Sequence, residues 1–274
     1  MSPSVGQVIQ FLTDLYNKGL GYSALNTARS ALSSVIEIEG KKVGEHPFVV
    51  RFLKGVFNLK PCIPKTNVSW DPQVVLDYLK TLSPVKTLDL KSLTIKCLSL
   101  LWLLTGQRGQ SMQLIDVRNI TINKNVLKIR FGDLLKTTRP GYQQRELTLK
   151  AYATDRRLCI VTVALEYLER RKVLCKEDVY QLFVSHQKPH DAVSKDTIAR
   201  WVKETMRKAG LDISIFTPHS VRAASTSKAI RARVPITTIL TTAGWSQENT
   251  FRKYYNKPIQ QEGFAERILE NHDK

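Results

Sequence analysis

Thr217-Pro218-His219-Ser220-Val221-Arg222 places a histidine and an arginine three residues apart at the predicted start of a helix. Proline suits the first turn of a helix because its missing N–H would have no partner there. Side chains at positions i and i+3 lie on one helix face, so the imidazole of His219 and the guanidinium of Arg222 are expected side by side. A single pair of this kind is more often structural than functional, and its meaning depends on the rest of the chain.

Three further stretches carry polar or aromatic side chains at predicted helix ends and turns. Thr105-Gly106-Gln107-Arg108 follows an apolar helix predicted over 89–104, and Lys136 lies in a turn-rich connection between two predicted strands. Tyr254 follows the tryptophan of Ala243-Gly244-Trp245 by nine residues. Taken alone, Arg108 is best interpreted as a surface cation at a helix end, and tyrosines at helix ends are usually packing residues.

The hydrophobic pattern predicts a mainly α-helical chain with a small antiparallel β-sheet, divided into two domains. Apolar residues recur at helical spacing through residues 1–60, where three or four short helices are expected. Residues 61–72 contain three prolines and no apolar periodicity, which is typical of an interdomain linker. Over 73–274, predicted helices surround three alternating segments, 120–122, 126–131 and 145–149, which are predicted as strands.

The chain has 274 residues, with 42 Lys and Arg against 24 Asp and Glu, and a formal net charge of +18. Nucleic acid, an anionic membrane or an acidic protein could each balance this charge, and composition does not separate them. No apolar run reaches the roughly 18–20 residues of a spanning helix, and the N-terminus lacks the features of a secretory signal, so an intracellular protein is expected. The four cysteines are far apart and form no Cys-x-x-Cys pair, so they are expected to be reduced.

In their order along the chain, these elements resemble the signature of the tyrosine recombinase (phage integrase) family. The matching residues are two arginines, a lysine, a histidine, a tryptophan and a tyrosine, namely Arg108, Lys136, His219, Arg222, Trp245 and Tyr254. The stretch from Gly244-Trp245 through Phe251 to Tyr254-Tyr255 looks most like the recombinases of eukaryotic DIRS-type and crypton-type mobile elements. The resemblance covers the whole chain. It implies a helical core-binding (SAM-like) DNA-binding domain over 1–60, a linker over 61–72, and a catalytic domain over 73–274 with a C-terminal tail helix.

The resemblance implies a site-specific DNA recombinase, or integrase, that cleaves and rejoins double-stranded DNA through a covalent 3′-phosphotyrosyl intermediate. It further implies insertion or excision of mobile DNA, such as a retrotransposon, by a homotetramer on paired DNA sites. The expected location is nuclear, and no membrane partner is expected. Because the covalent bond keeps the energy of the broken phosphodiester, neither a cofactor nor a metal is expected.

Each matching residue has a role that phosphodiester cleavage requires. The guanidinium groups of Arg108 and Arg222 would neutralise the non-bridging oxygens as negative charge develops on them. His219 would accept the proton of the attacking phenol, whose ordinary pKa is about 10. The resemblance gives Lys136 the task of protonating the leaving 5′ oxygen. Trp245 stands where many relatives have histidine, and its indole can donate to a phosphate oxygen but cannot transfer a proton.

Two of these assignments have alternatives within the sequence. The spacing of nine residues selects Tyr254 as the nucleophile, whereas the adjacent Tyr255 would point about 100° away on a helix. Lys136 is favoured over Lys128 and Arg139, which lie on the same predicted hairpin.

Ser111 departs from the family pattern, because the better-known bacterial and phage members carry an acid three residues after the first arginine. Gln110 or Asp116 would then have to support the site. His186 and His190 are four residues apart, but the proline between them argues against a continuous helix and hence against a metal site.

Two other functions share part of this pattern. A type IB topoisomerase uses similar residues but relaxes supercoils as a monomer, and the short N-terminal module and the apolar tail weigh against it. A domesticated DNA-binding protein that keeps the fold without catalysis is the alternative from another class. The complete set of matching residues weighs against that second alternative.

Overall fold

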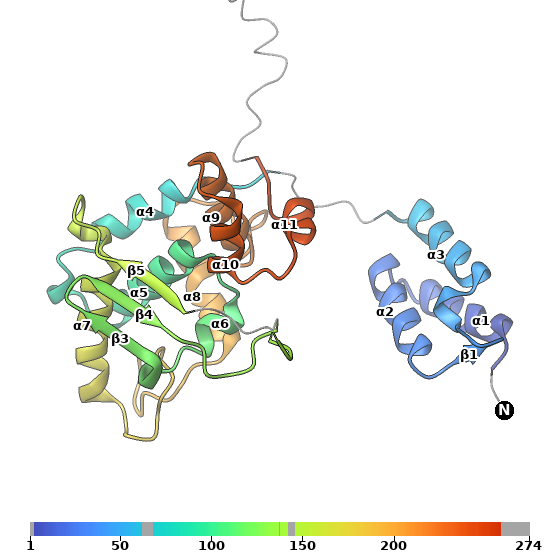
Figure 1. Ribbon diagram of the computed structural model, residues 1–274, viewed down its shortest axis with the longest axis horizontal. Coiled ribbons are helices and arrows are strands. Elements are labelled where there is room, and N and C mark those ends of the chain that lie inside the picture. The colour runs from blue at the N-terminus through green and yellow to red at the C-terminus, as the bar shows by residue number, and fades with distance from the viewer. Residues whose placement is uncertain (1–2, 62–67, 137, 142–145, 259–274) are drawn as a thin grey trace, which may run out of the picture. The chain divides into compact units, whose positions relative to one another are not determined.

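The computed structural model describes residues 3–61, 68–136, 138–141 and 146–258, with the backbone alone at Lys253 and Tyr254. The chain divides into two compact units, Met1–Lys65 and Thr66–Lys274, which are described separately (Figure 1). The division falls inside 61–72, the segment expected to link two domains. The tail helix expected near the C-terminus lies outside the described residues.

Three helices build the N-terminal unit: α1 (Val5–Asn17), α2 (Tyr22–Ser33) and α3 (Pro47–Leu59). They agree with the helical pattern of residues 1–60. A hairpin of β1 (Glu37–Ile38) and β2 (Lys41–Lys42), followed by the 3-10 helix η1 (Val43–Glu45), connects α2 to α3. These strands are too short for the sequence pattern to predict. The core of the unit consists of aliphatic side chains, namely Val8, Leu12, Leu25, Val43, Val49, Leu53 and Val56.

The larger unit contains a three-stranded antiparallel sheet in the order β3 (Ile120–Asn123), β4 (Val126–Ile129) and β5 (Leu147–Lys150). The helices of this unit are α4 (Pro72–Thr81), α5 (Leu90–Thr105), α6 (Gly109–Gln113), α7 (Ile160–Leu174), α8 (Lys195–Lys208), α9 (Ser220–Arg231), α10 (Ile236–Ala243) and α11 (Glu248–Tyr254). Short 3-10 helices are η2 (Val85–Thr87), η3 (Val117–Asn119) and η4 (Arg156–Leu158). The predicted fold class, mainly α with a small antiparallel sheet, is confirmed.

Helix α5 lies at the centre of the larger unit, where it contacts α7, α8 and α9 (Figure 1). Nearly every residue from Leu93 to Thr105 is buried, because apolar side chains cover all faces of the helix rather than one stripe. Asp89 begins the helix by accepting a hydrogen bond from the Ser92 N–H at 2.7 Å. Since α5 is fixed on every side, its C-terminal end is a rigid support for whatever follows it.

In the described part of the chain, no helix is long and apolar enough to cross a membrane. Cys97, Cys159 and Cys175 are free thiols, as expected for reduced cysteines, and Cys62 lies outside the described residues.

Substituting Leu12→Ala tests whether the N-terminal unit depends on its own core. Leu12 is fully buried among residues of that unit, so its truncation should lower the free energy of unfolding of the unit by about 2–5 kcal/mol. Hydrogen–deuterium exchange should show lost protection in α1–α3 and unchanged protection in α5. Phe11→Ala, at a position 47% exposed on the same helix, is the control. An equal loss of protection in α5 would contradict the separation of the two cores.

Candidate active site

Arg222 lies in the first turn of α9, and its side chain is only 1% exposed. Its Nη1 donates to the carbonyl oxygen of Gly106 at 2.6 Å and to that of Ala243 at 2.5 Å. Gly106 is the C-cap of α5, and Ala243 is the last residue of α10. A single guanidinium nitrogen therefore joins the ends of two helices to the start of a third.

The carbonyls of Gly106 and Ala243 lie at the C-terminal ends of α5 and α10. Each of these helices ends at a glycine with a left-handed backbone conformation. Gly106 has a φ of 58°, and Gly244, directly after Ala243, has a φ of 71°. Glycine adopts this conformation at little steric cost, and the last carbonyls of a helix have no partner within it. A Cβ on Gly106 would also meet Thr226 Cγ2 at 3.2 Å. These carbonyls carry the negative end of the helix dipole, which favours a nearby cation.

Arg108 and Gln107 attach the end of α10 to the loop that follows α5. Arg108 is the N-cap of α6, and its Nη1 donates to the carbonyl oxygen of Gly244 at 3.1 Å. Gln107 is buried, and its Nε2 donates to the carbonyl oxygen of Thr242 at 2.6 Å. Arg108 and Arg222 therefore both donate to carbonyl oxygens at the C-terminal end of α10. Gln107 has no role in the sequence-based hypothesis, although it stands inside the string that identifies Arg108.

The other donors of Arg222 are open only in the sense that they have no hydrogen-bond acceptor among the described residues. Its Nε and Nη2 are buried, and they make no hydrogen bond within the part of the chain that the structure describes. Burial, with a smaller contribution from the charge of Arg108, lowers the pKa of Arg222 to about 9. The group is still protonated at neutral pH. A charged guanidinium with two open donors is complementary to two oxygens of a phosphate group.

Trp245 forms one wall of the site. It is 4% exposed, and the guanidinium carbon of Arg222 lies 3.5 Å from the centre of its ring system. Phe251, from α11, packs on the same indole with ring centroids 4.9 Å apart. Stacking on an aromatic face fixes the plane of a guanidinium. Trp245 therefore packs and orients Arg222, and donation from its N–H to a phosphate stays a prediction.

His219 stands at the N-cap of α9, three residues before Arg222. Its Nε2 lies 3.0 Å from the hydroxyl oxygen of Tyr255. The surrounding protein removes water from the ring, and the charges of Arg222, Arg108 and Lys136 act in the same direction, so the pKa of His219 lies below its ordinary value of 6.5. The imidazole is consequently neutral at pH 7 and able to accept a proton.

Lys136 lies in the connection between β4 and β5. Its side chain is exposed, and its charge contributes to the lowered pKa of His219. The alternative Lys128 lies on β4 and forms an ion pair with Glu146 at 3.2 Å. Of these two lysines, Lys136 is the one whose charge acts on the site.

The two adjacent tyrosines differ in what the structure describes. Tyr254 is the last residue of α11, and its side chain lies outside the described residues, so its role as nucleophile stays a prediction. Tyr255 is the C-cap of α11, and its hydroxyl lies beside His219. The sequence hypothesis gives Tyr255 no role, and the pair of consecutive tyrosines was the signal that could have identified it.

Among the described residues, neither Arg108 nor Arg222 forms an ion pair with the acid that the sequence offers, Asp116. Ser111 is buried in α6, and Asp116 is held in an ion pair with Arg118 at 2.6 Å. Arg108 and Arg222 instead donate hydrogen bonds to backbone carbonyl oxygens at the ends of α5 and α10. The support that the family pattern assigns to a carboxylate is therefore provided here by the main chain.

His186 and His190 have structural surroundings. The ring of His186 stacks on Trp201 with centroids 4.2 Å apart, and Nδ1 of His190 lies 2.9 Å from the carbonyl oxygen of Ser185. Among the described residues, no group of three or more His, Cys, Asp or Glu side chains could hold a metal ion.

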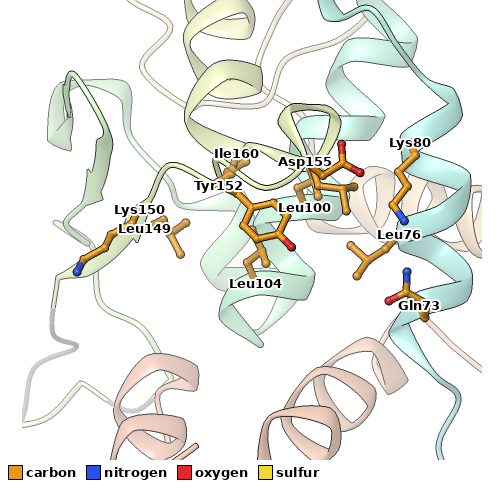
Figure 2. Close-up of a pocket in the computed structure, with 11 residues that line it drawn as sticks. Gln73, Leu76, Lys80, Leu100, Leu104, Leu149, Lys150, Tyr152, Asp155 and Ile160 are labelled. Atoms are coloured by element: carbon orange, nitrogen blue, oxygen red, sulfur yellow. The ribbon is translucent and has the colours of Figure 1, made fainter. Parts of the chain in front are cut away.

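A separate pocket of about 370 Å³ lies between α4, α5 and the segment after β5 (Figure 2). Leu76, Leu100 and Leu104 line it, and in Figure 2 the ring of Tyr152 lies among these side chains, with Lys80 to one side on α4. None of the residues expected to carry the chemistry lines it. Its Tyr152 therefore offers a control hydroxyl outside the active site.

The comparisons with known proteins point to one family. The model of the phage integrase family matches residues 73–261. Tyrosine recombinase XerA from Pyrococcus furiosus is 25% identical over 255 residues, which cover 92% of this chain and 76% of that protein. Among solved structures, the Tn1549 transposon integrase in complex with transposon right end DNA has a TM-score of 0.64 at 15% identity, over 98% of this chain and 84% of that one. The XerH site-specific recombinase bound to palindromic difH substrate, in a post-cleavage complex, has a TM-score of 0.63 at 16% identity, over 91% and 68% of the two chains.

Because the family model spans more than half of the chain, the protein belongs to the phage integrase family, the tyrosine recombinases. It is an enzyme that cleaves and rejoins DNA strands. The mainly helical fold with its small antiparallel sheet agrees with that class.

Replacing Arg222→Lys should lower the rate of DNA cleavage by about 10²–10³-fold, because an ammonium lacks the fork that reaches the carbonyls and a phosphate together. Arg231→Lys, exposed on the same helix, is the matched control. Single-turnover cleavage measures the effect. A rate for Arg222→Lys within about twofold of the wild type would show that the fork is not required.

The lowered pKa of His219 predicts the acid limb of the pH–rate profile. The neutral base predominates above its pKa, so the cleavage rate should be level near pH 7 and fall about tenfold per unit once the pH drops below that pKa. The His219→Gln variant should cleave DNA more slowly than the wild type, and its cleavage rate should no longer fall as the pH drops through this range. An unchanged acid limb in the variant would assign the proton acceptor to another group.

Proposed function

We propose that this recombinase cleaves DNA through a covalent 3′-phosphotyrosyl intermediate and uses the reaction to insert or excise mobile DNA. The observation that carries the proposal is the pair of open donors on buried Arg222, next to the hydrogen bond between His219 and Tyr255. A phosphate that enters this space meets charged donors on one side and a phenol with its proton acceptor on the other. These are the groups that a metal-independent phosphoryl transfer to tyrosine requires.

In this proposal, Arg222 and Arg108 bind the non-bridging oxygens and stabilise the charge that develops on them. A phenol of the Tyr254–Tyr255 pair attacks phosphorus. His219 receives the phenolic proton, and Lys136 protonates the departing 5′ oxygen. The reverse reaction with a new 5′ hydroxyl rejoins the strand without ATP.

Double-stranded DNA is the proposed partner, and a homotetramer on paired sites is the proposed assembly. The formal charge of +18 supports a polyanionic partner. The helical N-terminal unit would serve as the core-binding domain over 1–60, with the catalytic domain over 73–274. Among the similar structures, a lambda integrase dimer is bound to a core DNA site.

The biological setting that we propose is a eukaryotic mobile element of the DIRS or crypton type, acting in the nucleus. The support is the segment from Gly244-Trp245 to Tyr254-Tyr255, in which tryptophan replaces the histidine of many relatives. The similar Tn1549 integrase belongs to a transposon, which agrees with a role in DNA mobility.

Covalent capture tests the proposed function without knowledge of the target sequence. A pool of nicked suicide duplexes with randomised arms is incubated with the protein in EDTA, and adducts that survive SDS are isolated and sequenced. We expect an adduct that forms without metal and that selects a defined sequence from the pool. The nick releases the short cleaved strand, so the covalent intermediate cannot be resealed and accumulates.

The two alternatives give different results in the same experiment. A binding protein without catalysis would retain duplexes of a defined sequence without forming a covalent bond to them, so no SDS-resistant adduct would be found. A type IB topoisomerase would form adducts and would also relax plasmids that lack the selected sequence. Either result would contradict the proposed recombinase.

A further inference from the structure

We propose that Tyr255, rather than Tyr254, is the nucleophile of this recombinase. The assignment rests on the proposed function and decides between two tyrosines that the sequence leaves adjacent. Its starting point is the hydroxyl of Tyr255, which lies 3.0 Å from Nε2 of His219. This is the hydrogen bond between a nucleophile and its proton acceptor that activation of a phenol requires.

The ring of Tyr255 touches three residues of the candidate site. Its centroid lies 5.7 Å from that of His219 and 4.9 Å from that of Trp245, both in edge-on geometry. The guanidinium carbon of Arg222 lies 5.5 Å from the same ring. The phenol also favours the charged form of Arg222, although the open Nε and Nη2 donors make no standard hydrogen bond to it. A phosphate held by those donors would lie next to the hydroxyl of Tyr255.

The backbone holds Tyr255 in this position from both sides. Its N–H donates to the carbonyl oxygen of Phe251 at 2.9 Å, and Phe251 is fully buried. Its carbonyl oxygen accepts a hydrogen bond from the Ser227 hydroxyl of α9 at 3.0 Å. That hydroxyl in turn accepts from the Lys257 N–H at 3.1 Å. The residue is therefore anchored to α9, the helix that carries Arg222.

The position of Tyr255, the tenth residue after Trp245, follows from the end of α11. The helix ends at Tyr254, and Tyr255 follows with φ −123° and ψ −20°, outside the helical conformation. Consecutive side chains at a helix end differ in direction by about 100°, so one arrangement of this segment brings one of the two hydroxyls to His219. In the described structure, that hydroxyl belongs to Tyr255.

In the cleavage step, the phosphoryl group passes from the 5′ oxygen of the DNA to Tyr255. The oxygen of Tyr255 forms a bond to the scissile phosphorus while its proton passes to Nε2 of His219. The bond from phosphorus to the 5′ oxygen breaks, and that oxygen takes a proton from the ammonium group of Lys136. The 3′ phosphate stays esterified to Tyr255, and no electron donor or acceptor is needed.

Peptide mapping of the wild-type adduct tests the assignment directly. The protein is trapped on the suicide duplex pool described above, the DNA is trimmed with nuclease, and the tryptic peptide that begins at Tyr254 is fragmented in a mass spectrometer. We expect the remaining nucleotide on Tyr255. A nucleotide on Tyr254, or on any other tyrosine, would overturn the assignment and leave the proposed function intact. Absence of any wild-type adduct would overturn the proposed function and the assignment with it.

Two substitutions give an independent measurement. Tyr255→Phe should reduce adduct formation by at least about 10³-fold, because no other hydroxyl lies at the same point of the described site. Tyr254→Phe should retain most of the wild-type rate, and Tyr152→Phe controls for loss of a phenol elsewhere. The opposite pattern, with adduct formation lost in Tyr254→Phe and kept in Tyr255→Phe, would assign to Tyr255 the role of a packing partner of His219.

Discussion

The site depends on one contact, in which Nη1 of Arg222 donates hydrogen bonds to the carbonyl oxygens of both Gly106 and Ala243. A buried guanidinium needs acceptors, and the ends of α5 and α10 provide them where the helix dipoles are negative. The same contact fixes α9, whose first residues carry both Arg222 and the N-cap His219. The relative position of the two predicted side chains therefore follows from the place where two other helices stop.

Burial of Arg222 has an energetic consequence for its remaining donors. A buried charge is costly unless it is well hydrogen-bonded, and two donors of Arg222, Nε and Nη2, have no acceptor among the described residues. Burial accordingly lowers the pKa of Arg222 to about 9. An anion bound at Nε and Nη2 would accept the hydrogen bonds that these two donors lack. Because the donors are already oriented, little reorganisation is needed when charge develops on a bound phosphate, and such preorganisation is a large part of catalysis by electrostatic groups.

The sequence predicts much of this arrangement, because most of it depends on side-chain identity and periodicity. The mainly helical fold and the small antiparallel sheet are as predicted, and the roles of Arg108, His219, Arg222 and Trp245 stay predictions from spacing and resemblance. The supporting acceptors could not be predicted, since they are main-chain carbonyls and any residue could provide them. The choice between Tyr254 and Tyr255 could not be settled either, because it depends on whether α11 continues for one more residue. The substitution at Ser111 showed that a carboxylate was missing, but not that two helix ends take its place.

The most direct test of the account is a crystal structure of the protein on a nicked duplex selected by covalent capture. We predict that Nε and Nη2 of Arg222 lie about 2.7–2.9 Å from two oxygens of the scissile phosphate, while Nη1 stays on the carbonyls of Gly106 and Ala243. A phosphate bound elsewhere, or an Arg222 that leaves those carbonyls to reach it, would contradict the central role given to this contact.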